Sequence, residues 1–291
     1  MSCTLCPRLC SADRAAGEVG VCGVGAEAVV AKVMIHRWEE PCFGDRAGAV
    51  FFLGCPLRCV YCQNRPISRP RESGIAGETY PVPRLAELFL RLQSEGATCL
   101  DLVSPTQFAD KLAAALALVR GRLTIPVVWN TGGYERVETL RTLEGLVDVW
   151  LTDLKYGSAE LARAYSAAPD YPETALAALA EMVRQSPLAW SPDGSGRLLR
   201  GVVVRHLVLP GGRHDSILAL RRAAQTVPPF SVVLSLMRQY TPDFAPASLP
   251  ALRRRVTTFE YESVRAEALR LGFEGYGQDR ESARKEYTPV W

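Results

Sequence analysis

The chain has 291 residues, a formal net charge of +3 and 22% charged residues. This length can bury a large core as one α/β domain, and so small a charge imbalance argues against nucleic acid or an anionic membrane surface as a partner. No apolar run reaches the roughly eighteen residues of a membrane span, and the amino terminus does not resemble a secretion signal. We therefore expect a soluble, cytoplasmic protein.

The first part of the chain is rich in cysteine, with Cys3, Cys6, Cys10 and Cys22 close together. In a reducing cytosol, clusters of this kind indicate metal sites and not disulfides. Four thiolates can supply all four ligands of a tetrahedral metal site. A segment this short buries too little apolar surface to fold alone, so a bound metal would stabilise it. We predict a cysteine-rich, metal-binding extension over residues 1–45, with zinc or an iron-sulfur cluster as equally open alternatives.

Beyond a strand expected over residues 27–35, short β-branched or aromatic runs alternate with helical patterns. Six strands are expected over residues 49–53, 98–103, 125–129, 147–152, 201–209 and 231–236. Apolar stripes at helical spacing occur over residues 85–92, 108–119, 176–183 and 261–271. Alternating strands and helices favour a parallel sheet, either an open doubly wound sheet or a barrel.

Polar motifs follow nearly every expected strand, and this favours the barrel, in which sites are built from the loops at the carboxyl ends of the strands. We predict an α/β fold, a partial (β/α)6 TIM-like barrel with a C-terminal helical segment, over residues 46–291. Of the two cysteines outside the clusters, Cys99 lies in an apolar run and is expected in the core. Cys42 follows a proline in an apparent loop and is either a bystander or a ligand.

The loop after the first of these strands carries Cys55, Cys59 and Cys62, at Cys-x3-Cys-x2-Cys spacing. A structural zinc site or a fully ligated cluster takes four protein ligands, so three thiols on one loop suggest a [4Fe-4S] cluster that leaves one iron open to another molecule. The alternatives are three buried cysteines, or part of a zinc site with a remote fourth ligand.

This spacing, with Tyr61 before the last cysteine, resembles that of the radical S-adenosylmethionine (radical SAM) enzymes. The longer match from Gly54 to Asn64 is similar to the branch that contains the activating enzymes of pyruvate formate-lyase and their uncharacterised relatives. The resemblance implies that SAM binds the open iron and that Tyr61 and Asn64 lie at the cofactor site. It also implies that an electron from a donor such as flavodoxin or ferredoxin cleaves SAM to a 5'-deoxyadenosyl radical, with the hard chemistry supplied by the cofactor.

Two further loops offer neutral polar groups. Ser104 and Thr106 follow the second strand, where most members of the family carry a motif that holds the SAM amino group; the present residues offer hydroxyls instead of a carboxylate, so the groups that hold the amine stay open. They equally suit a helix N-cap. Asn130 and Thr131 follow the third strand and resemble an activating-enzyme segment that contacts SAM, although a plain turn would have the same composition.

The fourth and fifth strands end in charged residues. Asp153 and Lys155 share one strand face, and burying them requires that they pair with each other or with a ligand; an exposed ion pair is the alternative. By the resemblance, Asp153 lies near the SAM carboxylate, with a monovalent cation as a candidate mediator, and Lys155 near SAM or substrate. Arg205 and His206 point to opposite faces of the fifth strand, so only one of these two catalytic candidates can point into the barrel.

We therefore predict a radical SAM enzyme whose radical abstracts hydrogen from a partner, with a glycyl radical enzyme suggested by the resemblance. A second hypothesis is a radical SAM enzyme that acts on a small molecule or on another protein residue. A third is an iron-sulfur or zinc protein without catalytic activity, which would close both cysteine sites with four ligands and would not respond to SAM.

Overall fold

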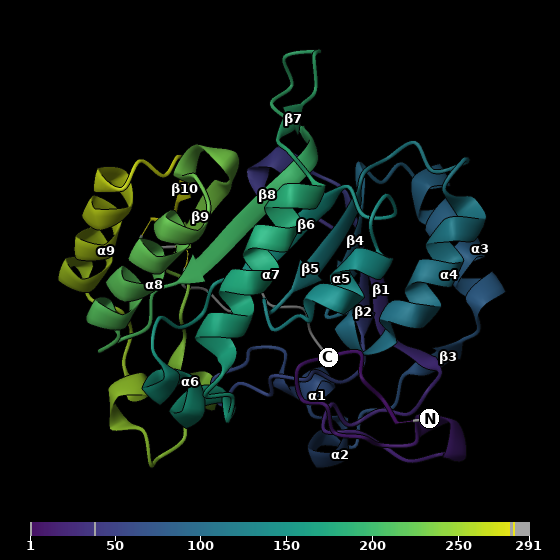
Figure 1. The fold of residues 1–291 in the computed structure, drawn as a ribbon, viewed down its shortest axis with the longest axis horizontal. Helices are drawn as coiled ribbons and strands as arrows, with labels where there is room; N and C mark the ends of the chain where they lie inside the picture. Colours follow the sequence, from purple (N-terminus) through teal and green to yellow (C-terminus); the bar gives the residue numbers. More distant parts are fainter. Residues whose placement is uncertain (1, 38, 280–281, 283–291) are drawn as a thin grey trace.

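One sheet organises the part of the chain that the computed structural model describes, residues 2–37, 39–279 and 282 (Figure 1). Its strands follow the order β10-β9-β8-β6-β5-β4-β2-β1-β3, and β7 pairs with β8 outside this path. The strands are β1 (Ala28–His36), β2 (Ala47–Phe52), β3 (Glu78–Tyr80), β4 (Cys99–Val103), β5 (Val127–Thr131), β6 (Val149–Asp153), β7 (Ala189–Trp190), β8 (Leu198–Leu207), β9 (Val233–Met237) and β10 (Gly275–Gly277).

Strands β2, β4, β5, β6, β8, β9 and β10 are parallel, whereas β1 and β3 extend the β2 edge in antiparallel register. The first six of these parallel strands are the six predicted from the sequence, and the predicted strand over residues 27–35 corresponds to β1. The α/β class and the mostly parallel sheet are therefore confirmed. The seventh parallel strand, β10, was not predicted.

Helices α3, α4, α7, α8 and α9 line one face of the sheet in Figure 1. The helices are α1 (Arg65–Ser68), α2 (Pro70–Ser73), α3 (Val82–Ser94), α4 (Ala109–Val119), α5 (Val137–Thr142), α6 (Ala159–Ser166), α7 (Tyr171–Gln185), α8 (Arg213–Thr226) and α9 (Thr258–Arg270). The four predicted helical patterns correspond to α3, α4, α7 and α9. No helix among the described residues is long and apolar enough to cross a membrane.

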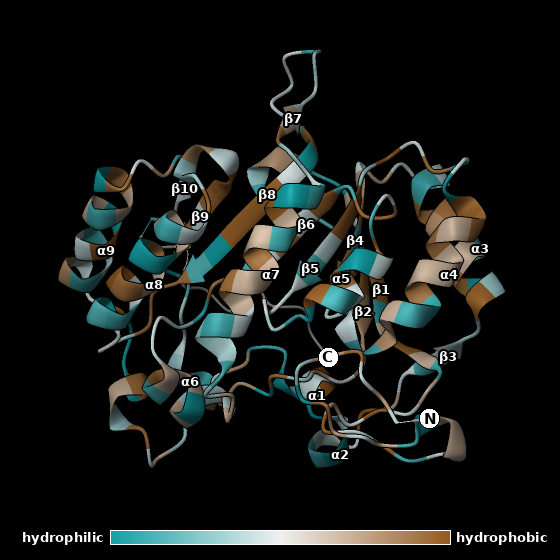
Figure 2. Ribbon diagram, viewed as in Figure 1, coloured by the Kyte–Doolittle hydropathy of each residue, from teal (hydrophilic) through white to brown (hydrophobic). Residues whose placement is uncertain are grey.

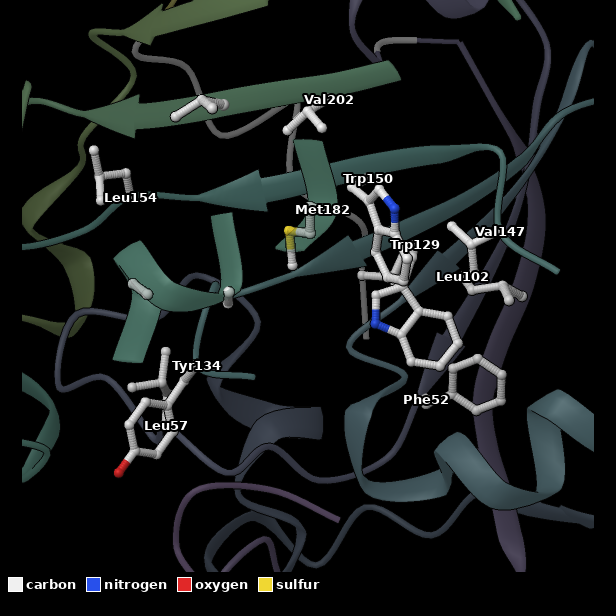
Figure 3. Packing of buried hydrophobic residues seen from close by; sticks show 14 of the residues in the cluster. Phe52, Leu57, Leu102, Trp129, Tyr134, Val147, Trp150, Leu154, Met182 and Val202 are labelled. Carbon is white, nitrogen blue, oxygen red and sulfur yellow. The ribbon is translucent and has the colours of Figure 1, made fainter. Parts of the chain in front are cut away.

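The main core lies between the sheet and these helices, where Figure 2 colours the strands brown and Figure 3 shows the packing. Trp129 of β5 and Trp150 of β6 are neighbours in the sheet register and meet edge to face, with ring centroids 6.3 Å apart. Met182 of α7 and Phe52 of β2 belong to the same cluster and lie on either side of this pair in Figure 3. Because side chains alternate along a strand, the neighbours of these residues point to the opposite face.

That opposite face changes character along the strands. Toward the amino ends it is apolar, with Val128, Val149, Val203 and other strand residues packed against Cys42. This second cluster contains both cysteines outside the predicted metal sites, Cys42 and Cys99. Further along the strands, positions of the same parity carry polar groups, namely Asp101, Asn130, Asp153, Arg205 and Ser235. The fold therefore closes one end of the sheet's inner space with hydrocarbon and lines the other end with polar side chains.

The division of the chain at residue 45 stays a prediction. Strand β1 belongs to the first part of the chain but pairs with β2 of the second. Figure 1 places the amino-terminal segment beside α1 and α2, at the end of the sheet opposite the β7 hairpin. The last residues of the predicted second domain lie outside the described residues.

Candidate functional site

A cavity of about 510 Å³ opens at the carboxyl ends of the strands. Residues from the loops after β2, β4, β5, β6, β9 and β10 line it, together with His36, Arg37, Glu39, Glu40 and Pro41. The predicted site residues that line it are Cys55, Cys59, Tyr61, Cys62, Asn64, Ser104, Asn130, Thr131, Asp153, Lys155 and Arg205. Groups far apart in the sequence therefore share one enclosed space, as a site at the mouth of a barrel requires.

The three thiols of the loop after β2 line the cavity together. Burial raises the pKa of the Cys55 thiol to about 12, and the negative charge that Cys59 and Cys62 would carry adds to this effect. Burial likewise raises the pKa of Cys62. Three thiolates cannot share this space without positive charge, and iron supplies that charge while it displaces the protons. The donor set therefore fits a cluster held by Cys55, Cys59 and Cys62, although no group of three or more His, Cys, Asp or Glu among the described residues already has the arrangement of a metal centre.

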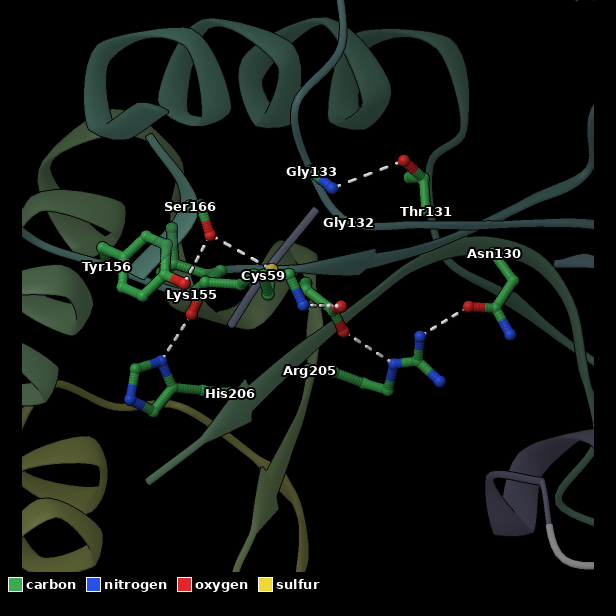
Figure 4. A network of polar contacts seen from close by, with 12 residues as sticks. Cys59, Asn130, Thr131, Gly132, Gly133, Lys155, Tyr156, Ser166, Arg205 and His206 are labelled. Carbon is green, nitrogen blue, oxygen red and sulfur yellow. Dashed lines mark hydrogen bonds and ion pairs between the residues drawn. The ribbon is translucent and has the colours of Figure 1, made fainter. Parts of the chain in front are cut away.

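An ion-pair network crosses the cavity floor between β5, β6 and β8 (Figure 4). Asp153 accepts from Lys155 Nζ at 2.5 Å and from Arg205 Nε at 3.0 Å. Arg205 also donates to Asn130 Oδ1 at 2.5 Å and lies 3.3 Å from Glu39. Burial alone would raise the pKa of Asp153, but Lys155 and Arg205 outweigh it and hold the pKa below its ordinary value. Asp153 is therefore an anion with both of its cations in place.

Two acidic residues that sequence reasoning missed lie next to this network. Asp101 is completely buried in β4, where Asn130 Nδ2 donates to it over 3.3 Å. Burial raises its pKa well above the ordinary value, and the neighbouring Glu39 adds to the shift. Burial also raises the pKa of Glu39, against the opposing effect of Arg205. These directions favour a proton shared between the two carboxyl groups, because two adjacent anions in this space would repel each other.

Two buried side chains tie the first post-strand loops together. Gln107 Nε2 donates to the carbonyls of Leu53 and Gly54, each at 3.0 Å, and to that of Ser104 at 2.8 Å, so it joins the end of β2 to the loop after β4. Glu135 accepts from the Thr106 hydroxyl at 2.5 Å and from the Thr131 hydroxyl, so it joins the loops after β4 and β5.

The next two loops are joined by Tyr171 of α7. Its hydroxyl lies 2.9 Å from the carbonyls of Gly132 and Asp153 and accepts from the Lys155 amide at the same distance. Gly133 makes this approach possible, since it has φ +78° and an added Cβ would lie 2.1 Å from the Asp153 carbonyl oxygen. The loops after β5 and β6 are therefore fixed against each other.

The structure corrects the roles expected for two residues. His206 is buried outside the cavity, where its Nδ1 donates to the Leu154 carbonyl at 2.6 Å, and burial lowers its pKa. Its Nε2 has no hydrogen-bond partner among the described residues. Arg205 is therefore the one of the pair that points inward, because alternation along β8 sends His206 toward the helices. Thr106 is also buried. Its hydroxyl donates to Glu135, and its side chain does not line the cavity.

The amino-terminal cysteines lie against the other cysteine loop. An added Cβ at Gly20 would lie 3.0 Å from Cys10 Sγ and 3.5 Å from Cys22 Sγ, so these two sulfurs are near each other. The Cys22 carbonyl accepts from the Cys55 amide at 3.2 Å. Burial raises the pKa of Cys6 to about 12. The four-cysteine metal site stays a prediction.

Arg8 is a further residue that sequence reasoning missed. It donates to the carbonyls of Pro56 at 2.8 Å and Leu57 at 3.3 Å within the cysteine loop, and to those of Ser166 at 2.7 Å and Ala167 at 2.5 Å. Its position between two cysteines gave no signal for this contact. By contrast, Asp101 had a signal, because it is a charge within an otherwise apolar strand.

Comparison with known proteins adds a likeness in fold. No protein-family model matches the chain. An uncharacterised protein of Methanocaldococcus jannaschii, MJ0674, is 26% identical over 271 residues, which cover 90% of this chain and 73% of that protein. A radical SAM methyltransferase from Sphaerobacter thermophilus superposes on 77% of this chain with a TM-score of 0.52 and 12% identity. The chain therefore shares the fold of that methyltransferase over this part of its length.

Methylornithine synthase (PylB) superposes on 76% of the chain with a TM-score of 0.49 and 16% identity. The superposition covers 63% of the length of each of these two solved structures. The likeness to the methyltransferase supports the partial TIM-like barrel predicted from the sequence.

Glu135 makes the stability of this end of the barrel depend on pH. Burial raises its pKa from 4.5 to about 7, so its stabilising effect is complete below pH 4.5 and is lost as the pH rises through 7. The difference of about 2.5 pKa units, at about 1.4 kcal/mol each, corresponds to about 3.5 kcal/mol over the whole pH range. Part of this loss occurs below pH 5, so between pH 5 and pH 8 the wild type should lose about 2 to 3 kcal/mol more free energy of unfolding than Glu135→Gln does. Denaturant unfolding at the two pH values measures this, and parallel pH dependence of the two proteins would contradict it.

Proposed function

We propose that the chain is a radical SAM enzyme. A bound [4Fe-4S] cluster would supply one electron to SAM, whose sulfonium bond breaks to give methionine and a 5'-deoxyadenosyl radical that takes hydrogen from a partner. The observation that carries the proposal is the set of three thiols, Cys55, Cys59 and Cys62, in one cavity with the Asp153 network. A carrier with closed four-ligand sites would not need a lined cavity beside its cysteines.

The residues of the chain have distinct roles in this proposal. The three cysteines hold the cluster, with Tyr61 and Asn64 beside them on the same loop. Ser104, Asn130 and Thr131 offer neutral polar groups to SAM. Lys155 and Arg205 bring positive charge to the cavity floor, which suits the SAM carboxylate. Asp153 keeps both cations in position, and it would bind the monovalent cation if one mediates the contact.

A more specific proposal concerns the partner that loses hydrogen to the radical. The sequence motif is similar to that of the pyruvate formate-lyase activating enzymes, so a glycyl radical enzyme is the first protein partner to test. Flavodoxin or ferredoxin is the corresponding electron donor. A small molecule or another protein residue is the alternative substrate, and incubation with SAM and candidate partners under reducing conditions separates the two by where hydrogen is lost.

Anaerobic reconstitution with iron and sulfide tests the enzyme proposal. We expect the electron paramagnetic resonance signal of the reduced protein to change when SAM is added, and 5'-deoxyadenosine to form after reduction. The triple variant Cys55→Ala, Cys59→Ala, Cys62→Ala should lose both responses. Cys99→Ala is the matched control, because Cys99 is buried in the second apolar cluster and should leave them intact. The proposal would be contradicted if the wild-type signal did not change when SAM is added and no 5'-deoxyadenosine formed after reduction.

We also propose that Cys3, Cys6, Cys10 and Cys22 hold a second metal, zinc or an iron-sulfur cluster. Metal analysis of the same triple variant tests this, because the first site is then removed. Zinc without iron would assign a structural site, and residual iron with sulfide would assign a second cluster. A triple variant that is folded by circular dichroism but contains neither metal would overturn the proposal.

A further inference from the structure

A row of hydrogen-bonded hydroxyl groups leads to the sulfur of Cys59 (Figure 4). Ser166 Oγ donates to Cys59 Sγ over 3.1 Å, and Tyr156 Oη lies 2.7 Å from Ser166 Oγ. Tyr61 Oη lies 2.9 Å from Tyr156 Oη. All four side chains are at most 7% exposed, so the row runs through the protein interior.

The direction of these hydrogen bonds follows from the number of protons. A cysteine that binds iron is a thiolate and can only accept, so Ser166 must donate its single hydroxyl proton to Cys59. The Ser166 oxygen then accepts from Tyr156, and the Tyr156 oxygen accepts from Tyr61. Hydrogen bonds aligned in one direction polarise one another, which makes the last donor in the row stronger than an isolated serine.

The fold holds Ser166 in place independently of the sulfur. Ser166 is the last residue of α6, and the next residue, Ala167, has a left-handed conformation with φ 48°. The Tyr165 carbonyl accepts from the Val60 amide of the cysteine loop at 2.9 Å, and the Ser166 carbonyl accepts from Arg8 at 2.7 Å. The turn that ends α6 is therefore fixed to the cysteine loop on one side and to the amino-terminal segment on the other.

A hydrogen-bond donor to a cysteine sulfur that binds a cluster changes the reduction potential of that cluster. Adding an electron to a cluster increases the negative charge on its sulfurs, and a hydrogen bond to one of them stabilises the reduced state more than the oxidised state. Burial strengthens the effect, because Ser166 and Cys59 are at most 7% exposed and a hydrogen bond is electrostatically stronger in the protein interior than in water.

We propose that Ser166 is a positioning residue that sets the reduction potential of the cluster, through its hydrogen bond to Cys59 and with Tyr156 behind it. This inference rests on the proposed function, because it requires a cluster on Cys59. The end of α6 contains no cysteine and lies outside the family motif. The inference gives this segment a role in setting how readily the cluster accepts an electron.

The test is the midpoint potential of the reconstituted cluster, followed by electron paramagnetic resonance during a redox titration. Ser166→Ala should shift the potential to a more negative value, since the donor to sulfur is lost. Tyr156→Phe keeps the serine but removes the group that polarises it, so a smaller shift in the same direction is expected. Ser186→Ala is the matched control, because this serine is also buried but its hydroxyl has no partner among the described residues; it should leave the potential unchanged.

Equal potentials for the wild type and Ser166→Ala at equal iron content would overturn the inference, as would an equal shift in Ser186→Ala. If Ser166→Ala does not fold or does not hold iron, Tyr156→Phe decides alone, and an unshifted potential in that variant overturns the inference. Failure of the wild type itself to bind iron and sulfide would instead contradict the proposed function.

Discussion

The buried contact between Asp153 and Arg205 is the constraint on which the site depends. The two residues are direct neighbours in the register of β6 and β8, and removing one partner of such a pair commonly costs about 3 to 5 kcal/mol because the other charge is left buried. Their contact fixes which face of both strands points inward. The same alternation sends Val203 into the second apolar cluster and His206 toward the helices.

Around this pair, the loops after β2, β4, β5 and β6 are each bound to the next by a buried side chain: Gln107, Glu135 and Tyr171 in turn. These contacts hold the polar groups in position before any ligand arrives, and such preorganisation lowers the cost of binding. The cysteine loop is held in the same way from two further directions, by Arg8 and by the turn that ends α6. The amino-terminal segment and α6 therefore support the three thiols, although neither carries one of them.

The sequence predicted the parallel strands because each is a short apolar run between polar loops, and all six lie within three residues of their expected starts. Strand β10 has only three residues, Gly275–Gly277, and no apolar run to mark it. Because side chains alternate along a strand, the sequence showed that only one of Arg205 and His206 faces inward. Which of the two does so depends on how the strand pairs with its neighbours. Glu39 reaches the site from a loop and Ser166 from the last residue of α6, and neither position is marked by a periodic pattern in the sequence. The three-cysteine loop was predictable because all its donors lie within eight residues.

The central claim is that the cluster held by Cys55, Cys59 and Cys62 keeps one iron open for SAM. Mössbauer spectroscopy of the wild-type protein reconstituted with iron-57 tests it most directly, because the spectrum reports the coordination of individual irons. Our account predicts that SAM changes the isomer shift of one iron per chain and leaves the others as they were. A spectrum that SAM does not alter would contradict the account, since every iron would then already have its full set of protein ligands.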